Sequence, residues 1–415
     1  MKKKTIVITL TSFLILASCA GHNQTKQNNQ KENTMVSDST KQYGYNKNFL
    51  KKHTEVIELK GTKSAVLLVP AWQGRVMTST AEGDSGFSFG WINRDLISSG
   101  MIQPHINAFG GEERIWLGPE GGQFSIFFSK GKPFVYSEWQ TPSFLDTTPY
   151  EVVSSSDTSA LFASDILTEN YSGTNFKLRM EREVILLNEK QILNQTSIDV
   201  TGLSCVAYKS SNKIINNGDN AWKKETGLLS IWMLGMFNPS PSVVIVIPVK
   251  HGDENLLGAK VNDNYFGKIS GDRLKVEDDH IFFRADGKSR GKIGIPPLRA
   301  TGIMGSYDSD NNILTILICR LPEGKTDYVN SSWQIQDKPF SGDALNSYND
   351  GPLEDGSQMG PFYELETSSP AADLKPGESL SHIQYTLHLT GDLTNLDKVS
   401  RKVLGVSIEE IRNAF

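Results

Sequence analysis

The stretch Phe109–Gly122 (FGGEERIWLGPEGG) concentrates charged and aromatic side chains between two glycine pairs. Its members able to do chemistry are Glu112, Glu113, Arg114, Trp116 and Glu120. An arginine fork donates hydrogen bonds to hydroxyls, a carboxylate accepts them, and an indole face packs on the apolar side of a sugar ring. We therefore predict that Glu113, Arg114 and Trp116 contact a saccharide, with His105 close by. The alternative is a glycine-rich turn that encloses an internal Arg–Glu pair.

Two glutamates form a second candidate, in the sequence Phe362-Tyr363-Glu364-Leu365-Glu366. If this segment is a strand, its alternation puts Glu364 and Glu366 on one face, roughly 7 Å apart. Carboxylates that close raise the pKa of one of them, which prepares a general acid or base. The alternative is a pair of solvated carboxylates on an outer face.

Two further regions supply candidate ligand contacts. In Phe176–Leu186, Arg182 occupies the register of the apolar side chains. It is predicted either to line a concave face or to leave the sheet through a bulge or its long stem. The loop-like segment Tyr328–Pro352 is rich in side chains that commonly contact ligands. The candidates taken from it are Trp333, Asn346, Tyr348 and Asp350.

Several familiar motifs are missing from the sequence. No CxxC, HxH or HExxH supports a zinc site, and there is no P-loop, GxSxG or dinucleotide fingerprint. The run from Asp308 begins like a calcium loop, but Ile313 stands where the required glycine belongs. We therefore predict no metal and no cofactor. Cys205 and Cys319 lie in apolar contexts, so buried free thiols are favoured over a disulfide between them.

The elements that must position these residues are strands. Apolar alternation of period two, separated by turn residues, recurs from His53 onward. Strands are predicted, among others, at Phe124–Phe128, Asn175–Leu187, Lys190–Val200, Ser242–Val249 and Ser381–Leu389. His382 and His388 fall on the polar side of the last strand and are predicted to lie at the surface. Helical periodicity is clear only after residue 390, where Ser407 and Glu410 form a capping box. We predict an all-β supersandwich of two large antiparallel sheets with a short C-terminal helical tail.

The N-terminus is predicted to be an export and lipidation signal. Three lysines precede an apolar run too short to span a membrane, and Leu16-Ala17-Ser18-Cys19 is a lipobox. We predict a signal peptide at 1–18, lipidated Cys19 with a flexible tether over 19–52, the β domain at 53–392 and the helical tail at 393–415. Removing Lys2, Lys3 and Lys4 lowers the formal net charge from −5 to about −8. That charge argues against nucleic acid as a partner.

The C-terminal stretch Phe362–Leu389 resembles the end of the galactose mutarotase-like (aldose 1-epimerase) superfamily. Leu365-Glu366-Thr367 and Leu374-Lys375-Pro376-Gly377-Glu378 match the order and spacing of its motifs, and Leu67–Ser79 is similar to its first strands. The resemblance implies a β-supersandwich that binds carbohydrate on its concave face, with Glu366 as catalytic base and Arg114 as a substrate-binding arginine. Within the superfamily, the chain looks closest to uncharacterised Bacteroidetes-type lipoproteins.

The sequence departs from that superfamily at the general acid. Its histidine motif near the middle of the chain corresponds to Ser210–Trp222, which contains no histidine, and its His-Gly-Gly segment is Phe109-Gly110-Gly111 here. One hypothesis is an epimerase-like enzyme in which Glu366, assisted by Glu364, is the base, with His105 or His251 as the acid. The alternative is a non-catalytic sugar-binding envelope lipoprotein. A glycan-cleaving enzyme is a third hypothesis, to which no specific motif points.

The expected partners are a carbohydrate or other small polar ligand and a membrane reached through the lipid anchor alone. Ala20 follows the lipidated cysteine, and the next residues lack an acidic cluster. We therefore predict an outer-membrane lipoprotein that faces the periplasm.

Overall fold

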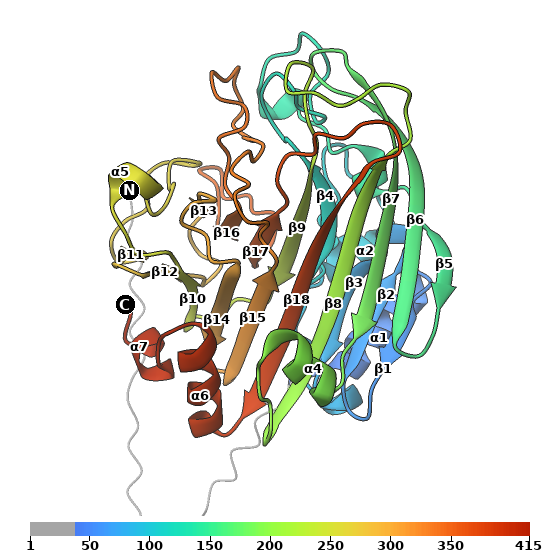
Figure 1. Ribbon diagram of the computed structural model, residues 1–415. Helices are drawn as coiled ribbons and strands as arrows, with labels where there is room; N and C mark the ends of the chain where they lie inside the picture. The colour runs from blue at the N-terminus through green and yellow to red at the C-terminus, as the bar shows by residue number, and fades with distance from the viewer. Residues whose placement is uncertain (1–37) are drawn as a thin grey trace, which may run out of the picture. The chain divides into compact units, whose positions relative to one another are not determined.

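A computed structural model describes residues 38–415 of this protein (Figure 1). The protein consists mainly of antiparallel β-sheets. The predicted signal peptide, Cys19 and the tether up to residue 37 lie outside the described residues. Ser39–Phe415 form one compact unit. Its two larger sheets have ten and five strands, and a third sheet has three. The predicted all-β class with two large antiparallel sheets is confirmed.

The ten-stranded sheet contains the longest strands, and its central members run side by side in Figure 1. In spatial order its strands are β11 (Leu274–Val276), β12 (His280–Arg284), β10 (Val243–Pro248), β14 (Ile303–Asp308), β15 (Ile313–Cys319), β18 (Ser379–Gly391), β8 (Leu203–Asn216), β7 (Asn175–Leu186), β6 (Ser159–Glu169) and β5 (Glu151–Ser155). Strands β6, β7 and β8 alternate buried and more exposed residues, which is the pattern that the sequence displays.

The five-stranded sheet packs one face against the ten-stranded sheet. In order its strands are β13 (Gly291–Ile295), β16 (Leu345–Asn349), β17 (Tyr363–Ser368), β9 (Ser230–Phe237) and β4 (Arg114–Gly118). Apolar side chains from both sheets, such as Ile293 and Leu365 with Ile245 and Leu317, form one buried cluster. The three-stranded sheet, β1 (Ile57–Lys60), β2 (Ala65–Val69) and β3 (Arg75–Thr80), contributes Leu59, Val66 and Val76 to another core cluster.

The orientation of strand β17 determines which of its side chains face the core between the sheets. The Tyr363 hydroxyl lies 2.8 Å from Ser306 Oγ on β14, and the Thr367 hydroxyl donates to Gln384 Oε1 on β18 at 2.7 Å. Tyr363, Leu365 and Thr367 therefore face the ten-stranded sheet. Because side chains alternate along a strand, Glu364 and Glu366 both point to the opposite face of the five-stranded sheet. They therefore share one face, as predicted.

Helices cover the other face of the ten-stranded sheet at one end. α4 (Glu189–Thr196), α6 (Leu393–Val403) and α7 (Ile408–Arg412) share an apolar cluster with β10, β15 and β18. The predicted helical tail forms, and the Ser407–Glu410 capping box begins α7. Helix α4 overturns the strand predicted at Lys190–Val200, because Asn188 and Gln191 form a second capping box there. The predicted strand at Phe124–Phe128 is an irregular segment.

The folded unit begins earlier than predicted. Residues 43–52 were assigned to the tether, but helix α1 (Tyr43–His53) forms, with Tyr43 and Leu50 fully buried. These two residues are seven apart, so they share one helical face that packs against Leu67 and Ile92. The polar composition around them hides this face in the sequence. None of the helices within residues 38–415 is both long and apolar enough to cross a membrane.

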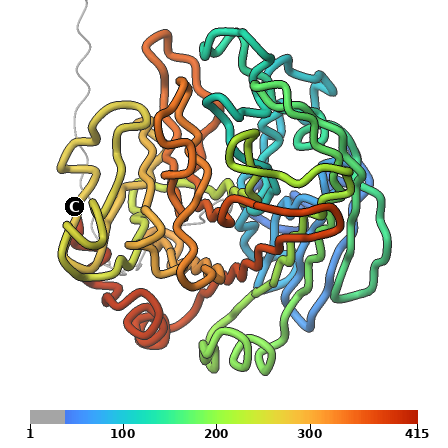
Figure 2. The backbone as a smooth tube through the Cα atoms, turned by 45° about the horizontal axis from the view of Figure 1, so that its top comes forward, coloured from blue at the N-terminus to red at the C-terminus, as the bar shows by residue number. Residues whose placement is uncertain are grey.

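The remaining elements are short and connect the sheets. They are η1 (Ser39–Lys41), η2 (Pro70–Trp72), η3 (Gly83–Ser85), α2 (Arg94–Ser99), η4 (Tyr136–Glu138), α3 (Ser143–Asp146) and α5 (Glu254–Leu257). In both Figure 1 and Figure 2, the teal loops that follow α2 and the orange loops on either side of β16 rise from the same end of the sheets.

Candidate functional site

A cleft of about 1430 Å³ lies over the outward face of the five-stranded sheet. Its floor is formed by side chains of all five strands of that sheet, and its walls come from the loops around α2, η4 and β16. Ligand pockets in proteins commonly measure about 300–1,000 Å³. This cleft is therefore large enough for a ligand of more than one ring.

Strand register brings the predicted carboxylates and Arg114 together. Glu366 is paired across the strands with Asn346 on one side and with Leu234 on the other, and Leu234 is paired with Arg114. Two residues earlier on β17, Glu364 is paired with Tyr348 of β16, which is paired with Lys292 of β13. Residues in such a row share a face of the sheet. Arg114, Lys292 and Glu364 therefore line the cleft floor, and Glu366 lies on the same face of the sheet, buried beside them.

The floor holds two ion pairs. Arg114 Nη2 lies 2.7 Å from Glu364 Oε1, and Lys292 Nζ lies 3.0 Å from Glu366 Oε2. The same Glu366 oxygen accepts a hydrogen bond from Trp232 Nε1 at 2.9 Å. Each cation also lies over an indole, Arg114 over Trp116 at 4.6 Å and Lys292 over Trp232 at 4.9 Å. These contacts fix the charged groups in position before any ligand arrives.

Several polar atoms of this region have no hydrogen-bond partner among the described residues. They are Glu366 Oε1, Arg114 Nε and Trp116 Nε1. A buried polar atom without a partner costs roughly 1–3 kcal/mol. Such atoms are retained where a ligand or water completes the hydrogen bonds.

Two carboxyl groups of the cleft, Glu364 and Glu120, have a raised pKa. Burial raises the pKa of Glu364 to about 7, against the lowering effect of Arg114 and with a further rise from Glu366. Burial also raises the pKa of Glu120 to about 7, where Lys292 opposes the rise and Glu366 adds to it. Burial alone would lower the pKa of Lys292, but Glu366, Glu120 and Glu364 raise it above its usual value. The floor therefore combines a permanent cation with carboxyls that bind a proton near neutral pH.

Aromatic side chains line the walls. Trp116 meets Trp232 edge-on at 5.5 Å between ring centroids, and Trp139 stacks on Trp333 at 5.9 Å. Trp116, Trp139, Trp232 and Trp333 all line the cleft. Indole faces beside hydrogen-bonding groups suit a ligand with one apolar and one polar side.

Most of the predicted site residues meet in this cleft. Those that line it are His105, Arg114, Trp116, Trp333, Asn346, Tyr348, Asp350 and Glu364. Glu366 lies directly beneath the floor, fully buried, and reaches it through Lys292 and Trp232. His105 lies on the cleft wall, where a hydrogen bond of 2.6 Å between its Nδ1 and the Trp139 carbonyl oxygen orients its ring. His251 is exposed and does not line the cleft.

Glu113 and Arg182 lie elsewhere, which corrects their inclusion among the saccharide contacts. Both side chains are fully buried between the sheets, where Arg182 Nη2 lies 2.8 Å from Glu113 Oε1. Arg182 also donates to Asn212 Oδ1 and the Gly74 carbonyl, and Gln384 donates to Glu113 Oε2. Arg182 points inward as its register predicted, but what it meets is a carboxylate of the core. Neither a bulge nor a ligand is needed to explain it.

Four residues line the cleft that were not predicted to contact a ligand: Lys292, Glu120, Trp232 and Tyr265. Lys292 carried a usable signal, since it interrupts the short apolar strand β13 as Arg182 interrupts β7. Glu120 was noted within the glycine-framed loop. Trp232 and Tyr265 stand far from the recognised motifs, and nothing local distinguishes them from core aromatics.

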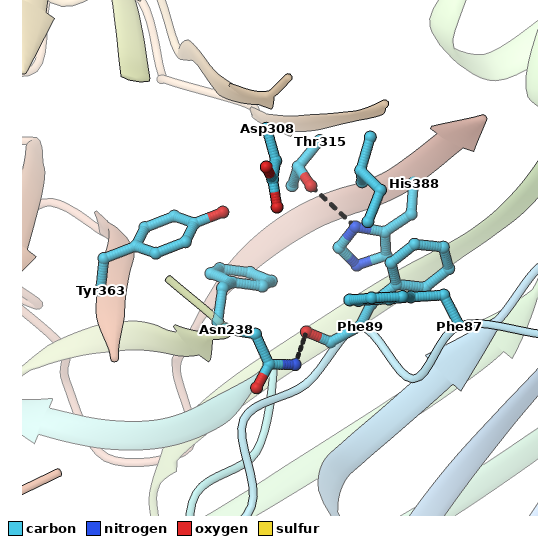
Figure 3. Close-up of a pocket in the computed structure, with 9 residues that line it drawn as sticks. Phe87, Phe89, Asn238, Asp308, Thr315, Tyr363 and His388 are labelled. Carbon is cyan, nitrogen blue, oxygen red and sulfur yellow. Dashed lines mark hydrogen bonds between the residues drawn. The ribbon is translucent and has the colours of Figure 1, made fainter. Parts of the chain in front are cut away.

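A second, much smaller cavity of about 20 Å³ lies between the sheets (Figure 3). In it, His388 Nδ1 bonds to the Thr315 hydroxyl at 2.9 Å and Asn238 Nδ2 donates to the Phe89 carbonyl at 3.1 Å. This space holds about one water molecule and no larger ligand. His388 and His382 are both buried, so their predicted place at the surface is wrong. Burial lowers the pKa of His382 to about 4, and the side chain bonds to Thr367 in its neutral form.

Two further predictions concern chemistry outside the cleft. Cys205 and Cys319 are free thiols, and burial raises the pKa of each to about 12, so neither is a nucleophile. Among residues 38–415, no three His, Cys, Asp or Glu side chains are grouped so that they could hold a metal ion.

Fold and site together define a class: an all-β supersandwich protein with one large, charged and aromatic cleft. The chain belongs to a family of unknown function (DUF6786), whose match spans residues 41–415. No curated protein matches the chain.

Several solved structures resemble the chain. One is the Slr1438 protein from Synechocystis sp. PCC 6803, with 13% identity, TM-score 0.49 and coverage of 82% of this chain and 96% of that one. A putative aldose 1-epimerase from Escherichia coli K12 has 11% identity and TM-score 0.48, over 81% of this chain and 99% of that one. A galactose mutarotase-like protein from Lactobacillus casei ATCC 334 has 10% identity and TM-score 0.49, over 81% of this chain and 100% of that one. These proteins include members of the superfamily that the sequence resembles, but at this level of likeness they bear on neither substrate nor activity.

Proposed function

We propose that the cleft binds a saccharide and catalyses proton transfer at its anomeric carbon, as an aldose 1-epimerase does. The observation that carries the proposal is Glu366, whose Oε2 is held by Lys292 and Trp232 while its Oε1 has no partner among the described residues. A carboxylate with one fixed oxygen and one free oxygen is suited to accept a proton from a hydroxyl group.

The ligand class follows from the side chains around Glu366. Arg114 and Lys292 donate hydrogen bonds, Glu120 and Asp343 accept them, and the indoles offer apolar faces. Donors, acceptors and indoles in one cleft suit a polyhydroxyl ring with an apolar side. The cleft volume of about 1430 Å³ favours a saccharide of two or more rings.

In the proposed reaction, Glu366 takes the proton of the anomeric hydroxyl. The bond between the anomeric carbon and the ring oxygen breaks, and the ring oxygen receives a proton. Rotation of the resulting aldehyde and reversal of these steps give the other anomer. Arg114 and Lys292 hold hydroxyl groups of the sugar and stabilise charge as it develops.

A non-catalytic saccharide-binding protein is the second candidate. It is favoured by one observation: the five strands of the cleft floor contribute no histidine, and His105 is bonded to a backbone carbonyl. Such a protein would bind the same ligands without interconverting their anomers.

Calorimetry with a panel of mono- and disaccharides tests the ligand class. The wild type should bind at least one of them, and Arg114→Ala should weaken that binding about 10- to 100-fold, because it removes charge-assisted hydrogen bonds. Arg179→Ala, on the ten-stranded sheet away from the cleft, is the control and should bind normally. Binding that survives Arg114→Ala would remove the proposed site.

NMR of freshly dissolved anomers then separates the enzyme from the binder. Glu366→Gln should slow anomerisation about 100-fold or more while the sugar still binds. A wild type that binds sugar but leaves the spontaneous anomerisation rate unchanged would support the non-catalytic alternative.

We also propose, from the lipobox at Leu16–Cys19, that the protein is a lipoprotein of the outer membrane facing the periplasm. Mass spectrometry of the N-terminal peptide from a membrane fraction should find a diacylglycerol adduct on Cys19. An unmodified, soluble chain would contradict the proposal.

A further inference from the structure

Ring opening needs a proton donor as well as the base, and the strands of the cleft floor carry no histidine. His382 and His388 lie between the sheets, His251 is exposed, and His105 is bonded to the Trp139 carbonyl. The other titratable groups that line the cleft are therefore candidate donors too.

Glu120 stands at a rigid point of the cleft wall, just beyond β4. Its backbone N–H donates to Ser331 Oγ at 3.2 Å, and its carbonyl accepts from Ser125 Oγ at 2.5 Å. The next residue, Gly121, packs so closely on the backbone of Ser332 that a Cβ there would come within 2.5 Å of its carbonyl oxygen. These contacts tie the Glu120 loop to the segment that carries Trp333. The backbone from which the Glu120 side chain projects into the cleft is thereby held in place.

The Glu120 carboxyl differs from its two neighbours in its partners. Glu364 is paired with Arg114 and Glu366 with Lys292, whereas no ion pair within the described residues includes Glu120. Its side chain is hydrogen-bonded to the indoles of Trp333 and Trp139, which lower its pKa. The charge of Lys292 also lowers that pKa, and the charge of Glu366 raises it. Burial and the absence of a bound cation keep a proton on this carboxyl, against the lowering effect of Lys292 and of the two indole groups.

We propose that Glu120 is the general acid of the cleft, working with Glu366 as the base. This assignment rests on the proposed anomeric proton transfer. Glu366 takes the proton from the anomeric hydroxyl, whose electron pair forms the carbonyl. The electrons of the breaking carbon–oxygen bond move to the ring oxygen, and the Glu120 carboxyl gives that oxygen its proton. Closure on the other face returns both protons, so the step is balanced without an oxidant or a metal.

The pKa of Glu120, raised by burial to about 7, agrees with this role. An acid is effective while protonated, so activity that depends on it should fall as the pH rises through that value. The pH profile of anomerisation is therefore the property that a merely structural glutamate would not move.

The experiment compares the wild type with Glu120→Gln, Glu120→Asp and the control Glu151→Gln, which alters an exposed glutamate on β5. Anomerisation of glucose, galactose and lactose is followed by NMR from pH 5 to 9, and binding of each sugar is measured by calorimetry. Glu120→Gln should slow anomerisation about 10²- to 10⁴-fold, remove the fall in rate above neutral pH and leave affinity within a few-fold. Glu120→Asp should restore part of the rate together with its pH dependence.

The outcomes separate the two proposals. If the wild type is active and Glu120→Gln keeps its rate and pH profile, the assignment of Glu120 is overturned while the proposed function stands. If the wild type accelerates anomerisation of none of these sugars, the proposed function fails and the assignment falls with it. Loss of sugar binding in Glu120→Gln without a change in the pH profile would make Glu120 a binding residue and also overturn the assignment.

Discussion

Glu113 and Arg114 are consecutive in the chain, yet they belong to ion pairs on opposite faces of the five-stranded sheet. Glu113 pairs with Arg182 in the core between the sheets, at 2.8 Å. Arg114 pairs with Glu364 on the floor of the cleft, at 2.7 Å. Both pairs are short and buried, but their surroundings differ.

In the core pair, every side-chain nitrogen of Arg182 donates a hydrogen bond and both oxygens of Glu113 accept one. In the cleft, Arg114 Nε and Glu366 Oε1 have no partner among the described residues. A fully satisfied network contributes to a unique folded state, whereas unsatisfied groups lower stability until a ligand completes them. The comparison indicates that one charged face of the sheet serves the fold and the other serves a ligand.

The largest expected effect is on the core pair. Arg182→Leu leaves Glu113 buried without its cation, so the free energy of unfolding should fall by about 3–5 kcal/mol. Urea denaturation measures the loss. Arg179→Leu, three residues earlier on the same strand but partly exposed, should cost at most about 1 kcal/mol. Equal losses for the two variants would contradict the structural role of the core pair.

The matching substitution on the cleft floor should lower the free energy of unfolding by less. Arg114→Leu leaves Glu364 without its partner, but the pKa of Glu364 is already raised by burial to about 7, so this carboxyl can take up a proton. A loss of about 1–2 kcal/mol is expected at pH 6, increasing at pH 8. A loss as large as that of Arg182→Leu would show that both faces serve the fold equally.

The smallest effect concerns Glu120. Since its folded pKa is about 7 and its ordinary value 4.5, the folded state binds this proton more tightly than the unfolded state does. The associated stability is therefore complete below pH 4.5 and disappears as the pH rises to about 7. Unfolding free energies from pH 6 to 8 should fall by about 1 kcal/mol less in Glu120→Gln than in the wild type. Glu151→Gln should keep the wild-type slope, and a wild-type slope in Glu120→Gln would contradict a raised pKa.

Much of this architecture could be predicted from local pattern. The period-two runs predict strands β7, β10 and β18 of the ten-stranded sheet, and the alternation in Tyr363–Glu366 predicts that two glutamates share a face. Strand β16 of the five-stranded sheet was not predicted, because it lies in the segment Tyr328–Pro352, which is loop-like in sequence. Helices α1 and α4 were missed, because their short apolar faces are diluted by polar residues or resemble strand patterns. A capping box at Asn188–Gln191 was the available signal for α4.

The site was only partly predictable for a similar reason. Arg114, Trp116 and Glu364 could be selected because charge and aromatic residues crowd into short segments. Lys292 could not be joined to Glu366, since 73 residues separate them and only the order of strands β13, β16 and β17 brings them together. Arg182 was wrongly assigned to the ligand, because its partner Glu113 lies just before β4, far from β7 in the sequence.

The sequence by itself determined the alternation of faces along each strand, because successive side chains of a strand point to opposite sides whatever the strand packs against. It could not determine which face would meet a second sheet. That was decided by tertiary structure, which buries Glu113 and Arg182 between the sheets and leaves Glu364, Arg114 and Lys292 at the cleft. Burial and strand order are properties of the assembled sheets, and they separate a charge that stabilises the fold from one available to a ligand.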